Sequence, residues 1–315
     1  MVLTTATHHP TGGRRRPWCP ALVAVLVAAI AVAMTACGGE STPTGSGLSV
    51  VAAENVWGDI VRQIGGDRVT VTSLVTDPNA DPHSFEAGAA AAAAIAHARL
   101  VVVNGAGYDT FVASLLAAGG SPALSQTVLA IDATVGATGP NVNPHLWYNP
   151  AYVTAGARAI AADLSKLDGN HAALFSTNLT TFLASYTVYQ ATIALIKQRH
   201  AGTSVAYTER VPEYLISAAG LTVASPANFA RAIEAGSEPS PADAAAMNSV
   251  LTQRAVRALL YNSQVTSPVT QAVKDLAARQ HIPVIGMAET IPAGTGDFET
   301  WQNNQAKALL AALGG

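Results

Sequence analysis

The chain has very little cysteine. Its 315 residues include two, Cys19 and Cys37. Both lie in an amino-terminal segment that we expect to be removed or lipid-modified, so the mature body would carry no free thiol. A disulfide framework and a cysteine-ligated zinc site are therefore excluded for that body.

Two catalytic motifs are also missing. The sequence contains neither a G-x-x-x-x-G-K-[ST] phosphate-binding loop nor an H-E-x-x-H zinc-protease helix. Any ATP hydrolysis would therefore belong to another subunit. The formal net charge is −3, and loss of the first 36 residues, which hold three arginines and no acidic residue, would leave −6. This mildly acidic balance argues against nucleic acid as a partner.

The amino terminus has the pattern of an export signal. Three arginines at 14–16 precede an apolar run over 21–34, which is too short to span a bilayer comfortably. Small residues then lead to Cys37. The pattern predicts a lipoprotein signal over 1–36, acylation of Cys37 and a flexible tether over 37–47. The protein would be extracytoplasmic and lipid-anchored to the outer face of the cytoplasmic membrane; an uncleaved membrane anchor is the alternative.

The remaining chain predicts an α/β fold with two lobes. Short apolar segments bounded by turn residues alternate with helical patterns in both halves. Strands are expected at 48–53, 69–75, 100–104 and 128–131, and then at 204–207, 221–224, 258–261 and 283–287. Such alternation implies two parallel sheets covered by helices.

One uninterrupted helical pattern separates the two halves. Neither glycine nor proline occurs from 172 to 200, and apolar residues recur there at steps of three and four, from Phe175 to Ile196. A single helix of this length would be about 43 Å long and could link the lobes as a rigid strut. We therefore divide the body into an amino-terminal lobe (48–168), a linking helix (169–200) and a carboxy-terminal lobe (201–315).

Four polar side chains follow predicted strands. His83 and His145 come after strands of the first half, each next to a proline that restrains the backbone, and Glu209 and Glu289 directly follow strands of the second half. In open α/β sheets, ligands bind beyond the carboxyl ends of the strands. Imidazoles and carboxylates are ligands that zinc accepts. The pattern therefore predicts one metal ion held in the cleft between the lobes.

These four residues also have simpler interpretations. A histidine after a strand is commonly a surface or capping residue. Glu209 could cap a helix that begins near Val211, where negative charge is favourable. Glu289 could be a solvated loop residue, with Asp297 as the substitute ligand. Trp147, two residues after His145, is interpreted as a packing anchor.

Several motifs together resemble those of the metal-binding lipoproteins of zinc and manganese ABC importers, in which a single long helix links two lobes. They are Asp-Pro-His-Ser-Phe-Glu at 81–86, Val-Val-Asn-Gly at 102–105, Asn-Pro-His-Leu-Trp-Tyr-Asn-Pro at 143–150, Thr-Glu at 208–209 and Ala-Glu-Thr-Ile at 288–291. The resemblance runs from about Leu48 to the carboxyl end. It implies that His83, His145, Glu209 and Glu289 are the metal ligands.

The chain departs from the family pattern near this site. Glu289 stands where the family generally has aspartate, and Asn143 and Asn149 stand where it often has aspartate. The histidine-rich loop of many zinc members is missing from 136–142. The longer glutamate changes the reach of the fourth ligand, and the asparagines lower the negative charge close to the site.

The resemblance implies a receptor that is not an enzyme. It would capture a divalent ion outside the membrane and deliver it, as a monomer, to an ABC permease with a separate ATPase subunit. Zinc is favoured over manganese because it binds most nitrogen and oxygen sites more tightly. An extracytoplasmic metal-dependent hydrolase, which would need an open coordination position and a base, and a surface adhesin lipoprotein are the alternatives.

Overall fold

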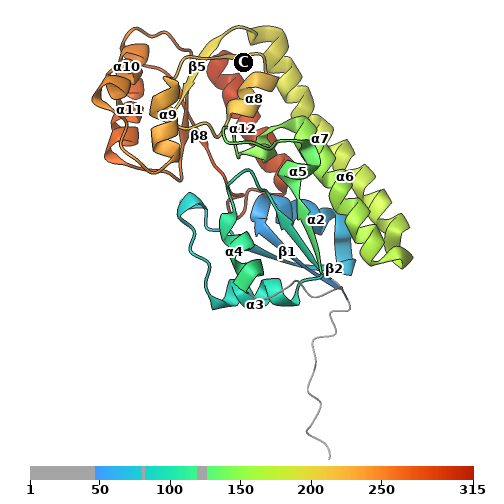
Figure 1. Ribbon diagram of the computed structural model, residues 1–315. Coiled ribbons are helices and arrows are strands. Elements are labelled where there is room, and N and C mark those ends of the chain that lie inside the picture. Colours follow the sequence, from blue (N-terminus) through green and yellow to red (C-terminus); the bar gives the residue numbers. More distant parts are fainter. Residues whose placement is uncertain (1–46, 80–81, 119–125) are drawn as a thin grey trace, which may run out of the picture. The chain divides into compact units, whose positions relative to one another are not determined.

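Two four-stranded parallel sheets form the framework of the protein (Figure 1). The computed structural model describes residues 47–79, 82–118 and 126–315. The predicted signal segment, Cys37 and nearly all of the predicted tether lie outside these described residues. The predicted α/β fold with two lobes and a long linking helix is confirmed.

The first sheet has the strand order β2-β1-β3-β4. Its strands are β1 (Leu48–Glu54), β2 (Val69–Val75), β3 (Leu100–Val103) and β4 (Thr127–Ala130). The helices of this lobe are α2 (Asn55–Gly65), α3 (Ala89–His97), α4 (Thr110–Ala118), α5 (Ile131–Val135) and α6 (Pro150–Leu167). Side chains alternate across the central strand: Val50 and Ala52 join the core under α2 and α6, whereas Val51 packs with residues of α3 and α4.

The second sheet has the matching order β6-β5-β7-β8. Its strands are β5 (Ser204–Tyr207), β6 (Thr222–Val223), β7 (Leu259–Asn262) and β8 (Val284–Met287). The helices are α8 (Glu213–Ala218), α9 (Ala227–Glu234), α10 (Pro241–Thr252), α11 (Pro268–Arg279) and α12 (Phe298–Leu313). The predicted strand 221–224 is shorter than expected, and α12 was not predicted.

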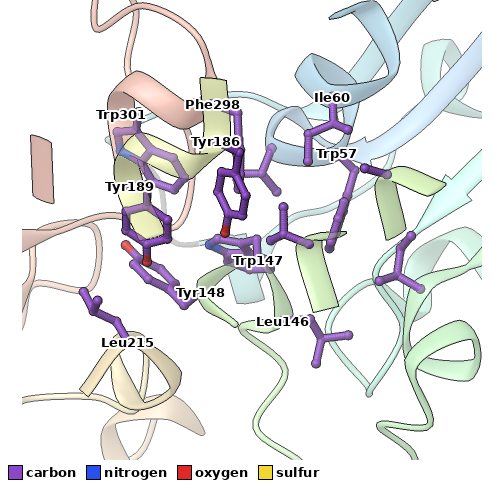
Figure 2. Close-up of a cluster of buried hydrophobic side chains, with 14 of the residues drawn as sticks. Trp57, Ile60, Leu146, Trp147, Tyr148, Tyr186, Tyr189, Leu215, Phe298 and Trp301 are labelled. Carbon is purple, nitrogen blue, oxygen red and sulfur yellow. The ribbon is translucent and has the colours of Figure 1, made fainter. Parts of the chain in front are cut away.

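The linking helix α7 (Ala172–His200) follows the 3-10 turn η4 (Gly169–His171) without a break in the chain. It packs against α2 and α6 of the first lobe and α12 of the second. Its buried row includes Phe182, Tyr186 and Tyr189, and Figure 2 shows Tyr186 and Tyr189 beside Phe298, Trp301 and the Trp147–Tyr148 pair. The segment 169–200 is long and apolar enough to cross a membrane by length and composition. Its aromatic face is nevertheless buried against both lobes, as the linking role requires.

Polar contacts also fasten the two lobes together beside α7. Asn55, at the start of α2, exchanges two 3.0 Å hydrogen bonds with the backbone of Ile291. Asp59 Oδ2 accepts a 2.9 Å hydrogen bond from the backbone N–H of Phe298. One hydrophobic core also runs through both lobes. These contacts restrict large hinge motion, and the exact lobe boundaries stay a prediction.

Candidate metal site

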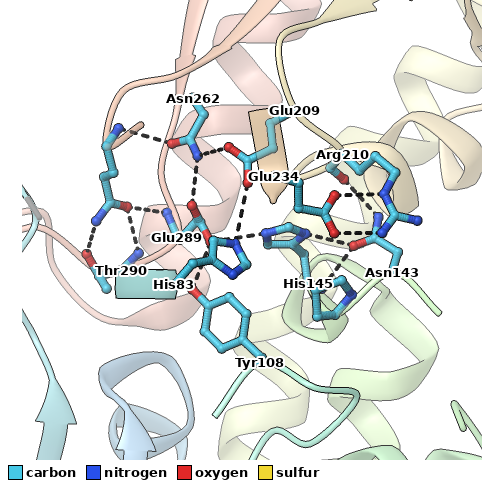
Figure 3. A network of polar contacts seen from close by, with 12 residues as sticks. His83, Tyr108, Asn143, His145, Glu209, Arg210, Glu234, Asn262, Glu289 and Thr290 are labelled. Carbon is cyan, nitrogen blue, oxygen red and sulfur yellow. Dashed lines mark hydrogen bonds and ion pairs between the residues drawn. The ribbon is translucent and has the colours of Figure 1, made fainter. Parts of the chain in front are cut away.

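The structure brings all four predicted ligand residues together. One donor atom from each of His83, His145, Glu209 and Glu289 lies within 4.8 Å of the others (Figure 3). The glutamates lie in loops just beyond the carboxyl ends of β5 and β8, as predicted. The two sheets meet at these edges, so residues far apart in the chain share one small volume.

The two histidines are held by short 3-10 turns. His83 is part of η2 (Pro82–Ser84), and His145 immediately precedes η3 (Leu146–Tyr148). Both turns include or follow a proline, which restricts the backbone as expected from the sequence. Three of the four side chains are fully buried, whereas the His83 side chain remains 21% exposed. His83 also lines a pocket of about 430 Å³, so it is the candidate ligand nearest to solvent.

Three nitrogen–oxygen distances define the cluster. Nε2 of His83 is 3.4 Å from Oε1 of Glu209 and 3.4 Å from Oε2 of Glu289. Nε2 of His145 is 3.0 Å from the same Oε2. A tetrahedron with zinc–ligand bonds of about 2.0–2.1 Å has edges of roughly 3.3–3.4 Å. These three spacings are thus already close to those of a tetrahedral zinc site.

Charge is distributed unevenly over the cluster. Burial opposes the charged form of His83, but its contacts with Glu209 and Glu289 raise its pKa to about 11. Burial also opposes the charged form of Glu289, yet the two histidines hold the pKa of that carboxyl below its ordinary value. Burial dominates at Glu209 and raises its pKa. A proton on His83 therefore balances the carboxylates when no ion is bound.

Asn143 orients the His145 ring. Its Oδ1 accepts hydrogen bonds from the His145 backbone N–H at 3.0 Å and from ring Nδ1 at 2.7 Å. Because Nδ1 donates to Asn143, Nε2 faces Glu289. The Asn143 amide also donates to the carbonyl of Arg210 at 2.8 Å and to Glu213 Oε2 at 3.0 Å. An aspartate at 143 could not make these donations, which gives this departure from the family pattern a structural reason.

Asn262, at the end of β7, holds both glutamates and was missed in the sequence analysis. Its Nδ2 donates to Oε2 of Glu209 at 2.6 Å and to Oε1 of Glu289 at 2.7 Å. β7 lies between β5 and β8 in the sheet, so its last residue emerges between the two glutamate loops. The rule that pointed to Glu209 and Glu289 could have found Asn262 as well.

Tyr108 is a second residue that the sequence analysis missed. Its hydroxyl donates a 2.8 Å hydrogen bond to Oε2 of Glu289. Its ring lies edge-on to His83, with centroids 4.8 Å apart, and to Trp147 at 5.1 Å. Trp147 is fully buried, as expected of a packing anchor. No metal-ligand spacing in the sequence pointed to Tyr108.

The alternative roles considered for the two glutamates do not fit the structure. Pro212, not Glu209, occupies the N-cap position of α8. Glu289 is fully buried rather than solvated. Asp297 caps α12 by accepting a 2.9 Å hydrogen bond from the backbone N–H of Thr300, and it is outside the cluster. The structure therefore gives Asp297 a capping role and does not place it with the four predicted ligands.

The family model that describes ZnuA, the periplasmic component A of a zinc-uptake complex, matches residues 50–312. The chain belongs to this family. The resemblance inferred from the motifs is confirmed at this level, and it covers nearly all of the described residues.

Individual relatives of this ZnuA-family chain are distant. It is 27% identical over 161 residues to the manganese-binding lipoprotein MntA of Halalkalibacterium halodurans, a match that covers 50% of this chain and 53% of that protein. The chain thus matches about half the length of such curated relatives.

Solved structures share the fold over a larger part of the chain. The periplasmic zinc-binding protein TroA from Treponema pallidum has a TM-score of 0.71 and 21% identity, covering 84% of this chain and 98% of that one. The laminin-binding adhesin Lmb of Streptococcus agalactiae, solved as a mutant, has a TM-score of 0.70 and 20% identity, covering 85% and 100%. At these identities the likeness establishes the common fold.

Proposed function

We propose that this protein captures a divalent metal ion, zinc in preference to manganese, and delivers it to an ABC permease with a separate ATPase subunit. The convergence of His83, His145, Glu209 and Glu289 in one buried cluster carries the proposal. Membership of the zinc-uptake family supports it. The proposal includes an extracytoplasmic location, a lipid anchor at Cys37 and a monomeric protein.

The preference for zinc rests on how the two carboxylates are held. Glu209 and Glu289 each direct one oxygen at a histidine, and each has its other oxygen hydrogen-bonded to Asn262. This arrangement favours one coordinating oxygen per carboxylate and thus four protein ligands in total. Four-coordinate tetrahedral sites suit zinc, whereas manganese gains from additional oxygen ligands.

The same geometry favours transport over hydrolysis. A catalytic zinc site keeps one position open for the water that attacks the substrate. Here four protein donors would complete a four-coordinate sphere, and three of them are fully buried. This arrangement suits an ion that is bound and later released whole.

Competition between the two ions tests the proposed function. The metal-free protein would be titrated with zinc and with manganese in the presence of a chromophoric chelator. We expect one ion per chain and displacement of bound manganese by zinc. If neither ion bound, metal capture would be refuted. Tighter binding of manganese than of zinc would refute the stated preference.

Replacing Asn262 with alanine is expected to narrow the preference for zinc. N262A frees the second oxygen of both glutamates, so the carboxylates can coordinate through two oxygens and raise the coordination number. The ratio of zinc affinity to manganese affinity should fall by about tenfold, the scale typical of residues that orient metal ligands. The same competition titration measures it, with N248A, an exposed asparagine on α10, as the control. An unchanged ratio in N262A would contradict the one-oxygen arrangement.

Zinc binding is expected to release a proton from His83. The two glutamates raise the pKa of His83 to about 11 against the effect of burial, and zinc needs the neutral ring. Zinc affinity should therefore rise by about tenfold per pH unit between roughly pH 7 and pH 10. Calorimetry in buffers of different ionisation enthalpy counts the released protons. A pH-independent affinity with no proton release over this range would contradict the expectation.

A further inference from the structure

Two helices of the second lobe end on residues with left-handed backbones. Arg254, after α10, has φ 51°, and His281, after α11, has φ 56°. In each case the backbone N–H of the following residue closes the helix end. The N–H of Ala255 donates to the carbonyl of Val250 at 3.0 Å, and that of Ile282 donates to the carbonyl of Ala277 at 2.9 Å. The left-handed position that ends α2, α5, α8, α9 and α12 is filled by Gly66, Gly136, Gly220, Gly236 and Gly314.

A side chain at such a position carries a steric cost that glycine avoids. At α11 this position is not needed to place a cation at the helix carboxyl end, because Arg279 supplies one from the last helical turn, whereas the last turn of α10 has no basic residue. The chain uses glycine where only the turn matters. His281 therefore indicates a side-chain use beyond ending its helix, and Arg254 places a guanidinium at the end of the neighbouring helix.

Arg254 and His281 line the same pocket. Its volume is about 360 Å³, and Arg257 and Gln280 also line it. No aspartate or glutamate is among the lining residues. Within the described part of the chain, the side chains of Arg254, Arg257 and His281 make neither an ion pair nor a hydrogen bond. Two arginines and a histidine thus converge without a counter-charge on a chain whose net charge is −3.

We propose that this pocket binds a phosphate-type oxyanion. Guanidinium groups offer planar, paired N–H donors that match phosphate oxygens, and an imidazole adds a further donor. The anion would be a free phosphate group or the phosphate of an anionic lipid headgroup. The proposal stands independently of metal capture, because it uses none of the metal-site residues.

The pocket lies at the far end of the second sheet from the metal site. Arg257 and His281 precede β7 and β8, whereas Asn262 and Glu289 lie at or beyond the ends of these strands. Each strand has four residues and spans roughly 13 Å. Variants in the pocket should therefore leave zinc affinity unchanged.

Phosphate titration of the full chain tests the proposal. Inorganic phosphate would be titrated by calorimetry into the parent protein, R257A and the double variant R254G/H281G, at an ionic strength of about 0.15 M, where exposed charges more than about 8 Å apart are largely screened. Both variants should bind phosphate about tenfold more weakly or worse, because charge-assisted hydrogen bonds are lost. The double variant places glycine at both left-handed positions, so its melting temperature should stay the same or rise. Weaker binding would then not be a consequence of unfolding.

A control variant tests where the phosphate binds, and a vesicle experiment identifies its source. R279A removes a positive charge from the same end of α11 but outside the pocket. It should change phosphate affinity by less than about twofold, because salt screens exposed charges that do not contact the anion. The second experiment measures binding to vesicles with and without phosphatidylglycerol. Vesicle binding that requires this lipid and is lost in R254G/H281G would assign a lipid headgroup as the ligand. Binding of inorganic phosphate without vesicle binding would assign a free anion. The proposal is overturned if neither probe binds, or if R279A weakens binding as much as the pocket variants do.

Discussion

Replacing His145 with alanine is expected to weaken zinc binding by roughly two orders of magnitude or more, because a direct ligand should matter more than the residues that orient it. His145 is fully buried, and its Nε2 is 3.0 Å from Oε2 of Glu289. Its ring is already fixed by Asn143, so little ordering is needed when the ion binds. The H145A protein would retain one imidazole and two carboxylates. The buried space left by the ring is bordered by Tyr108 and Trp147, which offer no replacement ligand.

The experiment compares H145A with a histidine variant outside the cluster. His171 pairs with Asp168 at the start of the linking helix, and H171A should bind zinc as the parent does. Competition against a chelator of known affinity gives both values, and melting curves without metal show whether H145A remains folded. A folded H145A protein with the zinc affinity of the parent would remove His145 from the ligand set and defeat the proposed site.

The sequence was sufficient to predict that these four side chains converge, because the geometry of parallel sheets did most of the positioning. Glu209 and Glu289 needed only the location of β5 and β8, since strand ends in one sheet share an edge. His83 and His145 needed more, because both follow their strands after loops. The prolines beside them, together with the family resemblance, were the information that selected them.

The surrounding residues were harder to predict because their roles depend on contacts between distant elements. Tyr108 is 181 residues from Glu289 in the sequence, and a tyrosine in a loop has many ordinary explanations. The helix α12 also went unpredicted. Its first residue, Phe298, lies against Tyr186 of α7, and Trp301 packs on Phe298 and Tyr148. The burial of α12 therefore depends on the fold of the whole chain rather than on a local sequence pattern.

The metal-free protein should become less stable as pH rises from about 7 toward the raised pKa of His83. The folded pKa is about 11 and the ordinary value is 6.5, so the stabilisation from the protonated ring is complete below about pH 6.5 and is lost as pH approaches 11. Zinc replaces that proton, and the zinc-loaded protein should lack this decline. Thermal melts at about pH 7 and pH 10 measure the difference, and H83Q should also reduce it. An equal decline in the parent, H83Q and zinc-loaded proteins would assign the effect to other groups.

Replacing Glu289 with glutamine is expected to reduce zinc affinity by roughly two orders of magnitude while preserving side-chain volume. Oε2 of Glu289 accepts from Tyr108 at 2.8 Å and lies near both histidines, and Oε1 accepts from Asn262 at 2.7 Å. A glutamine has one acceptor oxygen in place of two and no charge. Its amide would therefore leave either Tyr108 or Asn262 without an acceptor, and zinc would lose an anionic ligand.

The E289Q variant has a second readout that a purely structural role would not change. One of the two carboxylates that raise the pKa of His83 is lost, so this pKa should fall below about 11, and a pH titration of the His83 ring by NMR measures it. E299Q is the matched control, because Glu299 is also buried but contacts Ser185 and Gln63 at the lobe junction. E289D keeps the charge but shortens the side chain by one methylene, so it tests reach alone. If E289Q kept both the zinc affinity and the His83 pKa of the parent, Glu289 would be a structural residue and the cluster would contain at most three ligands.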